Sequence, residues 1–207
     1  NETNQWWSIG GLEAPSINQS ASTPLCQTTE LIDAQGDDAF LSAVDKTIKY
    51  IHAGDIFQAN ITLRFNAGIH GNIRQSALKM LTDPGGWYGA WLEFPDDGRY
   101  LLSMSPELFL SVDAESHSIV TRPMKGTRPE HDDPATLLHS DKDAAELHMI
   151  VDLMRNDLGR ICELGSIEVP ESRVLEKHPT VWQCVGEVRG TLREDCTPTD
   201  VLRATFP

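Results

Sequence analysis

Two carboxylates in the longest helical pattern of the chain are the first residues whose chemistry the sequence suggests. At about 100° per residue, Glu146 lies inside the apolar arc of a helix expected over about 142–163, and Asp143 lies beside it one turn earlier. A carboxylate on an apolar helix face is costly unless a cation or hydrogen bonds meet it. Glu146 is therefore either half of a buried ion pair with a basic residue from elsewhere or a ligand of Mg²⁺, which prefers oxygen donors. The spacing does not choose between them.

A lysine between prolines is the second candidate. In Pro123–Pro129, the two prolines and Gly126 restrict the backbone, so the sequence predicts that a stiff turn holds Lys125. A lysine in a desolvated pocket can lose its proton and become a nucleophile, whereas an exposed lysine at a turn stays an ammonium. Glu107 directly follows a predicted strand and a Ser-Pro pair, where a glutamate is more often solvated than catalytic.

A polar strand face is the third candidate. Ile56–Phe65 alternates apolar and polar residues, which predicts a strand with Gln58, Asn60 and Arg64 on one face. These side chains either line a cavity or meet water, and the alternation fits both.

The elements that must position these residues follow from hydrophobic periodicity and turn residues. We expect helices over 37–54 (closed by Gly54), 74–81, 135–139 leading into 142–163, and from 199 onward. Strands are expected over 56–65, 87–93, 100–103, 107–112, 118–122, 166–169 and 181–192. Consecutive strands without alternating helices predict an α+β fold with antiparallel sheets rather than a doubly wound one. Residues 1–36 are polar and weakly periodic, which indicates a linker.

Composition excludes several classes of function. The net charge of −14 and the lack of a basic patch argue against a nucleic-acid partner, and no segment reaches the length of a membrane span. Four scattered cysteines favour reduced thiols in a soluble cytoplasmic protein over a disulfide scaffold. His139 and His178 have no zinc-site spacing, and no glycine motif supports nucleotide binding. The chain begins with Asn1 rather than Met and ends at Pro207 just after a helical pattern, so we expect an internal fragment of a longer protein.

Read together, four motifs resemble the chorismate-utilising (chorismate-binding) enzyme family. They occur in order at Tyr50–Asn60, Ser105–Glu107, Pro123–Pro129 and Glu146–Arg160. The resemblance implies an anthranilate-synthase-component-I-like fold, with antiparallel sheets and helices packed outside them, truncated here. It also implies that 37–207 is a partial chorismate-binding catalytic domain and that 1–36 is a linker or the remnant of an upstream domain.

The resemblance implies a role for each candidate. Glu146 binds Mg²⁺, which Asp143 supports through water, while Lys125 is the nucleophile and Glu107 the general acid or base. The implied substrate contacts are Thr127, Gly126, Gln58 and Gln183.

Two positions sort the members of this family. Isochorismate and salicylate synthases carry a lysine that activates water where this chain has Gln58, and anthranilate synthases usually carry alanine at Lys125. The resemblance thus favours the aminodeoxychorismate synthases, component I, which aminate chorismate at C4 for 4-aminobenzoate and folate synthesis. Their ammonia comes from a glutamine amidotransferase partner. An anthranilate synthase component I and a non-catalytic chorismate-binding relative stay open as alternatives.

The chain also departs from the family pattern. Gln183 and Gly186 stand where members often have histidine and serine, so any proton transfer assigned to that histidine is in doubt. Glu130 stands where arginine is common. The second Mg²⁺ glutamate of the family and its arginine and tyrosine substrate contacts are expected beyond Pro207.

Overall fold

The computed structural model describes residues 26–34, 36–82 and 87–206. The fold divides into two compact units, one within 17–77 and the other within 78–207. The predicted boundary between 36 and 37 separates a linker from a domain and stays a prediction, because most of 1–36 lies outside the described residues. Among the described residues, no helix is both long and apolar enough to cross a bilayer.

The unit formed by 17–77 contains one long helix and short strand pairs. Its helix α1 (Asp37–Ala53) ends at Gly54, which has the left-handed φ of 80° expected of a helix-ending glycine. Strand β1 (Gln27–Thr28) pairs with β4 (Ile69–His70), and β2 (Ile32–Asp33) pairs with β3 (Phe65–Asn66). Helix α2 (Ile73–Thr82) crosses the boundary between the units.

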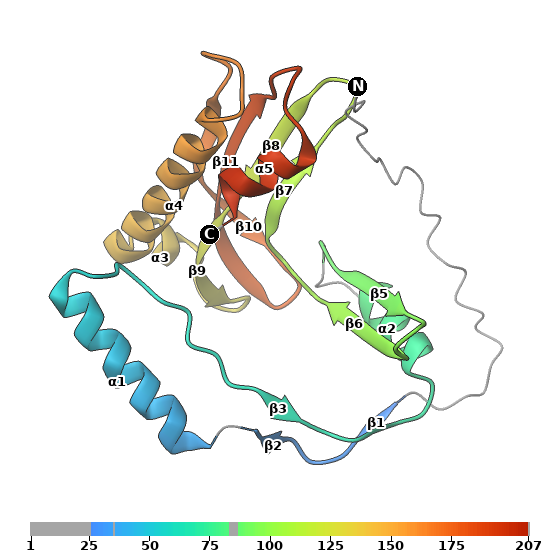
Figure 1. Cartoon of the computed structure of the whole chain (residues 1–207). Helices are drawn as coiled ribbons and strands as arrows, with labels where there is room; N and C mark the ends of the chain where they lie inside the picture. The colour runs from blue at the N-terminus through green and yellow to red at the C-terminus, as the bar shows by residue number, and fades with distance from the viewer. Residues whose placement is uncertain (1–25, 35, 83–86, 207) are drawn as a thin grey trace. The chain divides into compact units, whose positions relative to one another are not determined.

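The unit formed by 78–207 is built on antiparallel strands (Figure 1). A hairpin joins β5 (Ala90–Phe94) to β6 (Arg99–Ser103). The larger sheet has the order β10-β11-β8-β7, and β9 also pairs with β11, so β8 and β9 follow each other along one side of β11. These strands are β7 (Leu108–Val112), β8 (Ser118–Arg122), β9 (Met124–Pro129), β10 (Glu168–Lys177) and β11 (Val181–Thr191).

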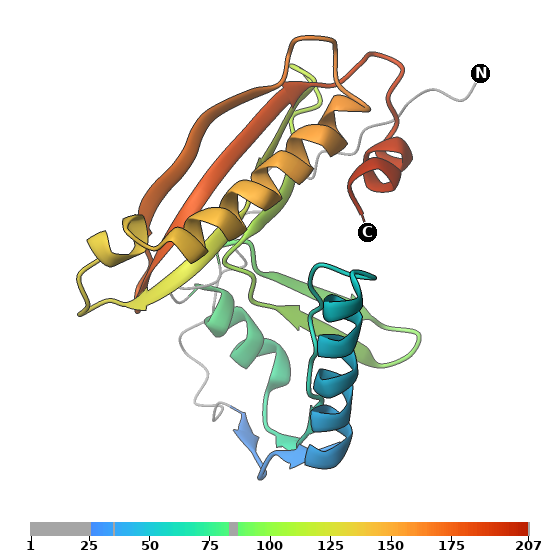
Figure 2. The same ribbon diagram turned by 90° about the vertical axis from the view of Figure 1, so that its left-hand side faces the viewer.

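Three helices complete this unit: α3 (Ala135–Leu138), α4 (Asp141–Gly159) and α5 (Pro198–Thr205). Helix α4 lies along one face of the larger sheet (Figure 2). Its fully buried Leu147 and Leu158 belong to the same core cluster as Cys184 and Val188 of β11. Gly186 lets the helix approach, since a Cβ there would lie 2.7 Å from Cγ2 of Val151. Burial of this apolar stripe is what holds α4 on the sheet.

The expected α+β class with antiparallel sheets is confirmed, and so are most of its elements. Three details were wrong. Residues 56–64 are not a strand; only Phe65 and Asn66 pair, because the ladder needs a partner strand and β2 is two residues long. The turn predicted around Lys125 is strand β9. Strand β10 runs well past the predicted 166–169, with two register shifts against β11 that hid its alternation.

Candidate functional site

Strand β9 carries Lys125 beside a bulge. Thr127 pairs with Gln183 of β11, but Lys125 pairs with the next residue, Cys184, so Gly126 is the extra residue of the bulge. Its φ of 78° lies in the left-handed region, which glycine adopts without strain. The prolines therefore bracket an irregular strand rather than a turn, and the bulge stands next to the candidate nucleophile.

The bulge rests on the corner between α3 and α4. A Cβ at Gly126 would lie 2.9 Å from Cγ of Asp143 and 2.9 Å from Cδ2 of Leu137, closer than real Cβ atoms approach. Only a glycine fits this contact. Gly126 and Asp143, two candidates named from the sequence, thus meet in a packing contact between strand and helix.

Asp143 is held in place on both sides. Its backbone N–H donates to the hydroxyl of Ser140, the residue that caps α4, at 3.2 Å. Its carboxylate, with only 13% of the side chain exposed, accepts a hydrogen bond from Arg128 of β9 at 3.2 Å. Sequence reasoning missed Arg128 as a partner, although it lies in the same motif as Lys125.

Glu107 contacts the start of β9. Its Oε1 accepts the backbone N–H of Met124 at 2.9 Å. The Ser105 hydroxyl fixes the loop around it, accepting from the Glu107 N–H at 3.3 Å and donating to the Glu107 carbonyl at 3.0 Å. The carboxylate expected to act as general acid or base is therefore anchored to the residue before Lys125.

Glu146 is less enclosed than the helical pattern predicted. Its side chain is 44% exposed, and Oε1 lies 3.8 Å from Nζ of Lys142 on the same helix. Of the two alternatives from the sequence, the buried ion pair with a basic residue from elsewhere is absent among the described residues. The apolar arc is itself divided: Leu147 faces the sheet and is fully buried, while Met149 and Leu153 are 43% and 51% exposed.

The remaining candidates divide between the two units. The Gln183 amide nitrogen lies 3.4 Å from the Thr127 hydroxyl, and its amide oxygen is buried without a hydrogen-bond partner in the described part of the chain. Gln58 is exposed and belongs to the unit formed by 17–77, whereas the other candidates belong to the unit formed by 78–207.

The carboxylates of α4 differ in their fitness for a metal ion. Glu146 is open to solvent apart from one exposed lysine, which suits an ion that takes one or two protein carboxylates together with water and substrate. Asp143 has its carboxylate turned to Arg128. No group of three or more histidines, cysteines or acidic residues able to hold a metal occurs among the described residues. The donor set thus fits Mg²⁺ through Glu146 alone.

A charged cluster missed by sequence reasoning lies beside Met124. Arg122 pairs with Glu176 and with Glu187, the latter at 3.3 Å. Burial opposes the charge of Arg122, but the hydrogen bonds and charges of Glu176 and Tyr88 outweigh it and raise its pKa. The ion cluster joins β8, β10 and β11 through Arg122, two residues before the start of β9.

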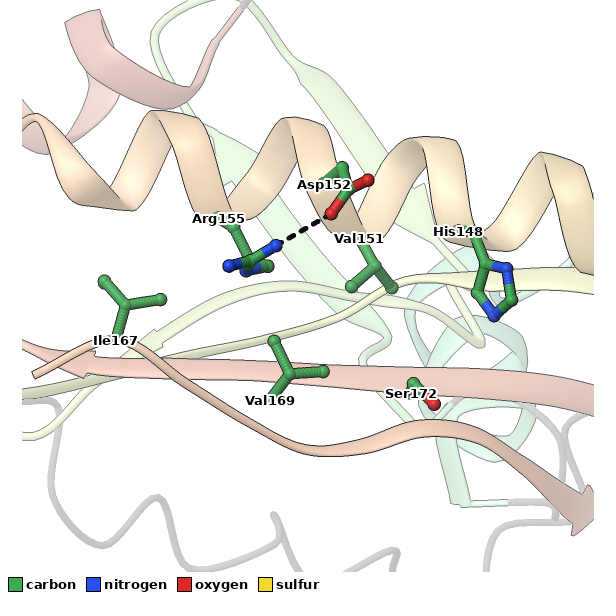
Figure 3. A pocket seen from close by; sticks show the side chains of 7 residues that line it. All are labelled: His148, Val151, Asp152, Arg155, Ile167, Val169 and Ser172. Carbon is green, nitrogen blue, oxygen red and sulfur yellow. Dashed lines mark hydrogen bonds and ion pairs between the residues drawn. The ribbon is translucent and has the colours of Figure 1, made fainter.

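A hollow of 440 Å³ lies on the other flank of α4 (Figure 3). Side chains of α4 and of 167–172 point toward each other across it: His148, Val151, Asp152, Arg155, Ile167, Val169 and Ser172. Its one ion pair, Arg155 to Asp152 at 3.0 Å, lies within α4. Neither Lys125 nor Glu146 lines this hollow, so it is separate from the candidate site.

Comparison with known proteins bears on the family and the fold. A family model described as "chorismate binding enzyme" matches residues 2–207. The chain is 40% identical over 166 residues to aminodeoxychorismate synthase component 1 of Escherichia coli, covering 77% of the chain and 36% of that protein. It is 38% identical over 179 residues to anthranilate synthase component 1 1 of Haloarcula marismortui, covering 82% of the chain and 35% of that protein.

A solved structure gives the same picture. The crystal structure of anthranilate synthase component I from Streptococcus pneumoniae matches with a TM-score of 0.77 at 30% identity, covering 87% of this chain and 40% of that one. The expected anthranilate-synthase-component-I-like fold is therefore confirmed. The chain spans about a third of the length of the curated relatives that it matches, 36% and 35% for these two.

Proposed function

Because the chain belongs to the family of chorismate binding enzymes, we propose that its full-length protein is an aminodeoxychorismate synthase component I. In this proposal the protein aminates chorismate at C4 with ammonia from a glutamine amidotransferase partner, in the synthesis of 4-aminobenzoate and folate. Relatives named aminodeoxychorismate synthase component 1 at 40% and 39% identity support this assignment.

The observation that carries the proposal is the anchoring of β9. The Glu107 carboxylate holds the backbone of Met124 at 2.9 Å, and Gly126 packs against Asp143, so Lys125 is fixed between two contacts. A lysine held at a defined place suits nucleophilic catalysis, which divides one difficult displacement into two easier steps.

The proposed reaction proceeds in two steps, with Lys125 as the nucleophile and Glu107 as the group that transfers protons. The neutral Nζ of Lys125 bonds to C2 of chorismate, the ring double bonds shift, and the C4 hydroxyl leaves as water with a proton from Glu107. Ammonia then bonds to C4 as the C2–N bond breaks and its electron pair returns to Lys125. Glu107 takes the proton that the ammonia nitrogen loses.

Binding of the dianionic substrate needs local cations in a chain with a net charge of −14. Glu146 is the residue that would hold Mg²⁺, which supplies charge neutralisation for a substrate carboxylate when bound. The buried Gln183 oxygen has no hydrogen-bond partner among the described residues, and a substrate hydroxyl or an N–H group would satisfy it. Gln58 has no basic nitrogen, so activation of water in place of ammonia is disfavoured.

Product analysis tests the proposal. The full-length protein is incubated with chorismate, Mg²⁺ and ammonia, which replaces the partner. We expect a product that persists until an aminodeoxychorismate lyase is added, and release of fluorescent anthranilate would contradict the proposal. Mass spectrometry during turnover should find the substrate adduct on Lys125; Lys125→Ala should abolish both adduct and turnover, whereas Lys177→Ala should keep both.

Anthranilate synthesis is the second candidate. It is favoured by the 38% identity to anthranilate synthase component 1 1 of Haloarcula marismortui, close to the value for the first candidate. The same incubation distinguishes the two, because only the second candidate releases anthranilate without an added lyase.

A further inference from the structure

The corner between α3 and α4, defined as Leu137–Asp143, accepts hydrogen bonds from arginines of two different strands. Arg128 of β9 donates from its guanidinium to the Asp143 carboxylate at 3.2 Å. Arg173 of β10 donates from its guanidinium to the carbonyl oxygen of Leu137 and to that of Ser140, the latter at 3.3 Å. The corner is thus tied to both strands that pair with the first half of β11.

The hydrogen bonds of Arg173 to this corner depend on a bulge in β10. Between the pairs Glu171–Glu187 and Val174–Val185, β10 uses one residue more than β11. This bulge includes Arg173, whose side chain is only partly exposed. Bulges commonly redirect a side chain in this way. The two strands flanking β11 therefore each use a bulge at the α3–α4 corner.

The position of β9 against this corner determines where Lys125 lies. A bulge leaves one residue unpaired, and its location decides which one: with the extra residue at Gly126, Lys125 pairs with Cys184, whereas a bulge one residue earlier would leave Lys125 itself unpaired. The contact of Gly126 with Asp143 and Leu137 fits only one location of the bulge, because any side chain there would collide with both.

We infer that the α3–α4 corner fixes the register of the bulge in β9, and that Asp143 is a positioning residue for Lys125 rather than a support for the metal. The catalytic consequence rests on the proposed function; the structural part does not. Asp143 acts through its ion pair with Arg128 and its packing against Gly126, while Glu146, one turn further along α4, is free of both contacts.

Hydrogen exchange and Mg²⁺ titration on the full-length protein test this inference. Asp143→Asn, Arg128→Gln and the double variant are compared by amide exchange of 124–128. A charge-assisted hydrogen bond lost from a partly buried site predicts exchange about 10-fold faster in each single variant. The double variant should exchange no faster than the singles, because both remove one interaction. Asp152→Asn, which breaks an exposed pair on the same helix, should leave these amides unchanged.

Dependence of activity on the Mg²⁺ concentration distinguishes a positioning role of Asp143 from a role in supporting the metal. If Asp143 positions Lys125, both single variants lower kcat and leave the Mg²⁺ concentration for half-maximal activity as in the unaltered protein. Unchanged exchange over 124–128 in Asp143→Asn would overturn the inference, and so would a raised Mg²⁺ requirement in Asp143→Asn but not in Arg128→Gln. The exchange readout needs no turnover, so a protein that makes no aminodeoxychorismate but loosens β9 would refute the proposed function alone.

Discussion

Helices α1 and α4 have similar lengths, 17 and 19 residues, but are stabilised differently. Helix α4 buries Leu147, Val151, Met154, Asp157 and Leu158. No side chain of α1 is buried among the described residues. What α1 has instead is local: two aspartates in its first turn, where the helix dipole favours negative charge, and a left-handed glycine at its end.

The difference indicates that tertiary packing fixes the position of α4 but not that of α1. A helix held by propensity and caps is marginal and frays, whereas one held by a packed face stays in register with the sheet beneath it. The candidate site lies against α4. Because packing fixes the position of this helix, it also fixes the site residues that contact the helix.

Truncation of the α4 core should have the largest effect. Leu158→Ala removes a side chain that is fully buried and should lower the free energy of unfolding by about 2–5 kcal/mol. Leu153→Ala on the same helix is the matched control, since Leu153 is 51% exposed and its loss should cost less than about 1 kcal/mol. Chemical denaturation measures both, and equal losses would mean that α4 is not held by its sheet-facing stripe.

Thiol reactivity should report the same core. Burial raises the pKa of Cys162 from 9.0 to about 11, so at pH 8 its thiolate fraction is about 100-fold below that of an ordinary thiol. Alkylation of Cys162 should be slower by at least this factor in the folded protein and normal in denaturant, with the half-buried Cys26 as internal control. Because folding raises this pKa, its contribution to stability is full below pH 9 and is lost as the pH rises toward 11. Equal labelling of both cysteines would contradict the packing.

Overpacking beneath α4 should have an intermediate effect. In Gly186→Ala the new methyl would lie 2.7 Å from Cγ2 of Val151 and 3.2 Å from the Ser172 carbonyl oxygen, which predicts a loss of about 1–3 kcal/mol. Gly159→Ala, where nothing lies within 4 Å, should be neutral or stabilise by up to about 1 kcal/mol. Adding Val151→Ala to Gly186→Ala should cost less than the sum of the two losses; strict additivity would show that this contact is not the cause.

Changes in α1 should be the smallest. Gly54→Ala strains a residue at φ 80° by about 1 kcal/mol, so amide exchange in the last turn of α1 should rise about fivefold. Ile48→Ala, at a position 46% exposed, should change stability by less than about 0.5 kcal/mol. A loss of several kcal/mol from Ile48→Ala would show that α1 is held by packing, as α4 is.

Local signals were enough to predict much of this fold. The apolar spacing of α1 and α4, the glycine after α1 and the alternation in β8 all specify an element without reference to distant residues. The fold class followed from their order. The resemblance to a family, which rests on residues in four motifs, correctly predicted the fold that the comparisons show.

Errors arose where tertiary contacts decide. Alternation in 56–65 predicted a strand, yet its partner, β2, provides two residues only. Proline and glycine around Lys125 predicted a turn, but β11 offers a ladder that accommodates them with one bulge. The shifts in β10 break the period of two on which recognition of a strand depends.

The sequence named candidate residues for the site, but their contacts could not be predicted from it. Glu107, Lys125, Gly126 and Asp143 were all named from sequence, and the structure joins Glu107 to Met124 and Gly126 to Asp143. Arg173 carried no signal, because its contact with the α3–α4 corner exists only through a bulge. Periodicity gives the face of a helix on which a residue lies, but the exposure of Glu146 depends on what covers that face.

The two register shifts of β10 also affect how copies of the protein can associate. Strand β10 is the outermost strand on its side of the larger sheet as described, and Pro170 within it has no N–H to donate. Straight outer strands invite unrelated chains to add on and seed fibrils, whereas a kinked one presents donors and acceptors out of step. We therefore expect concentrated solutions to resist strand-by-strand aggregation along this side.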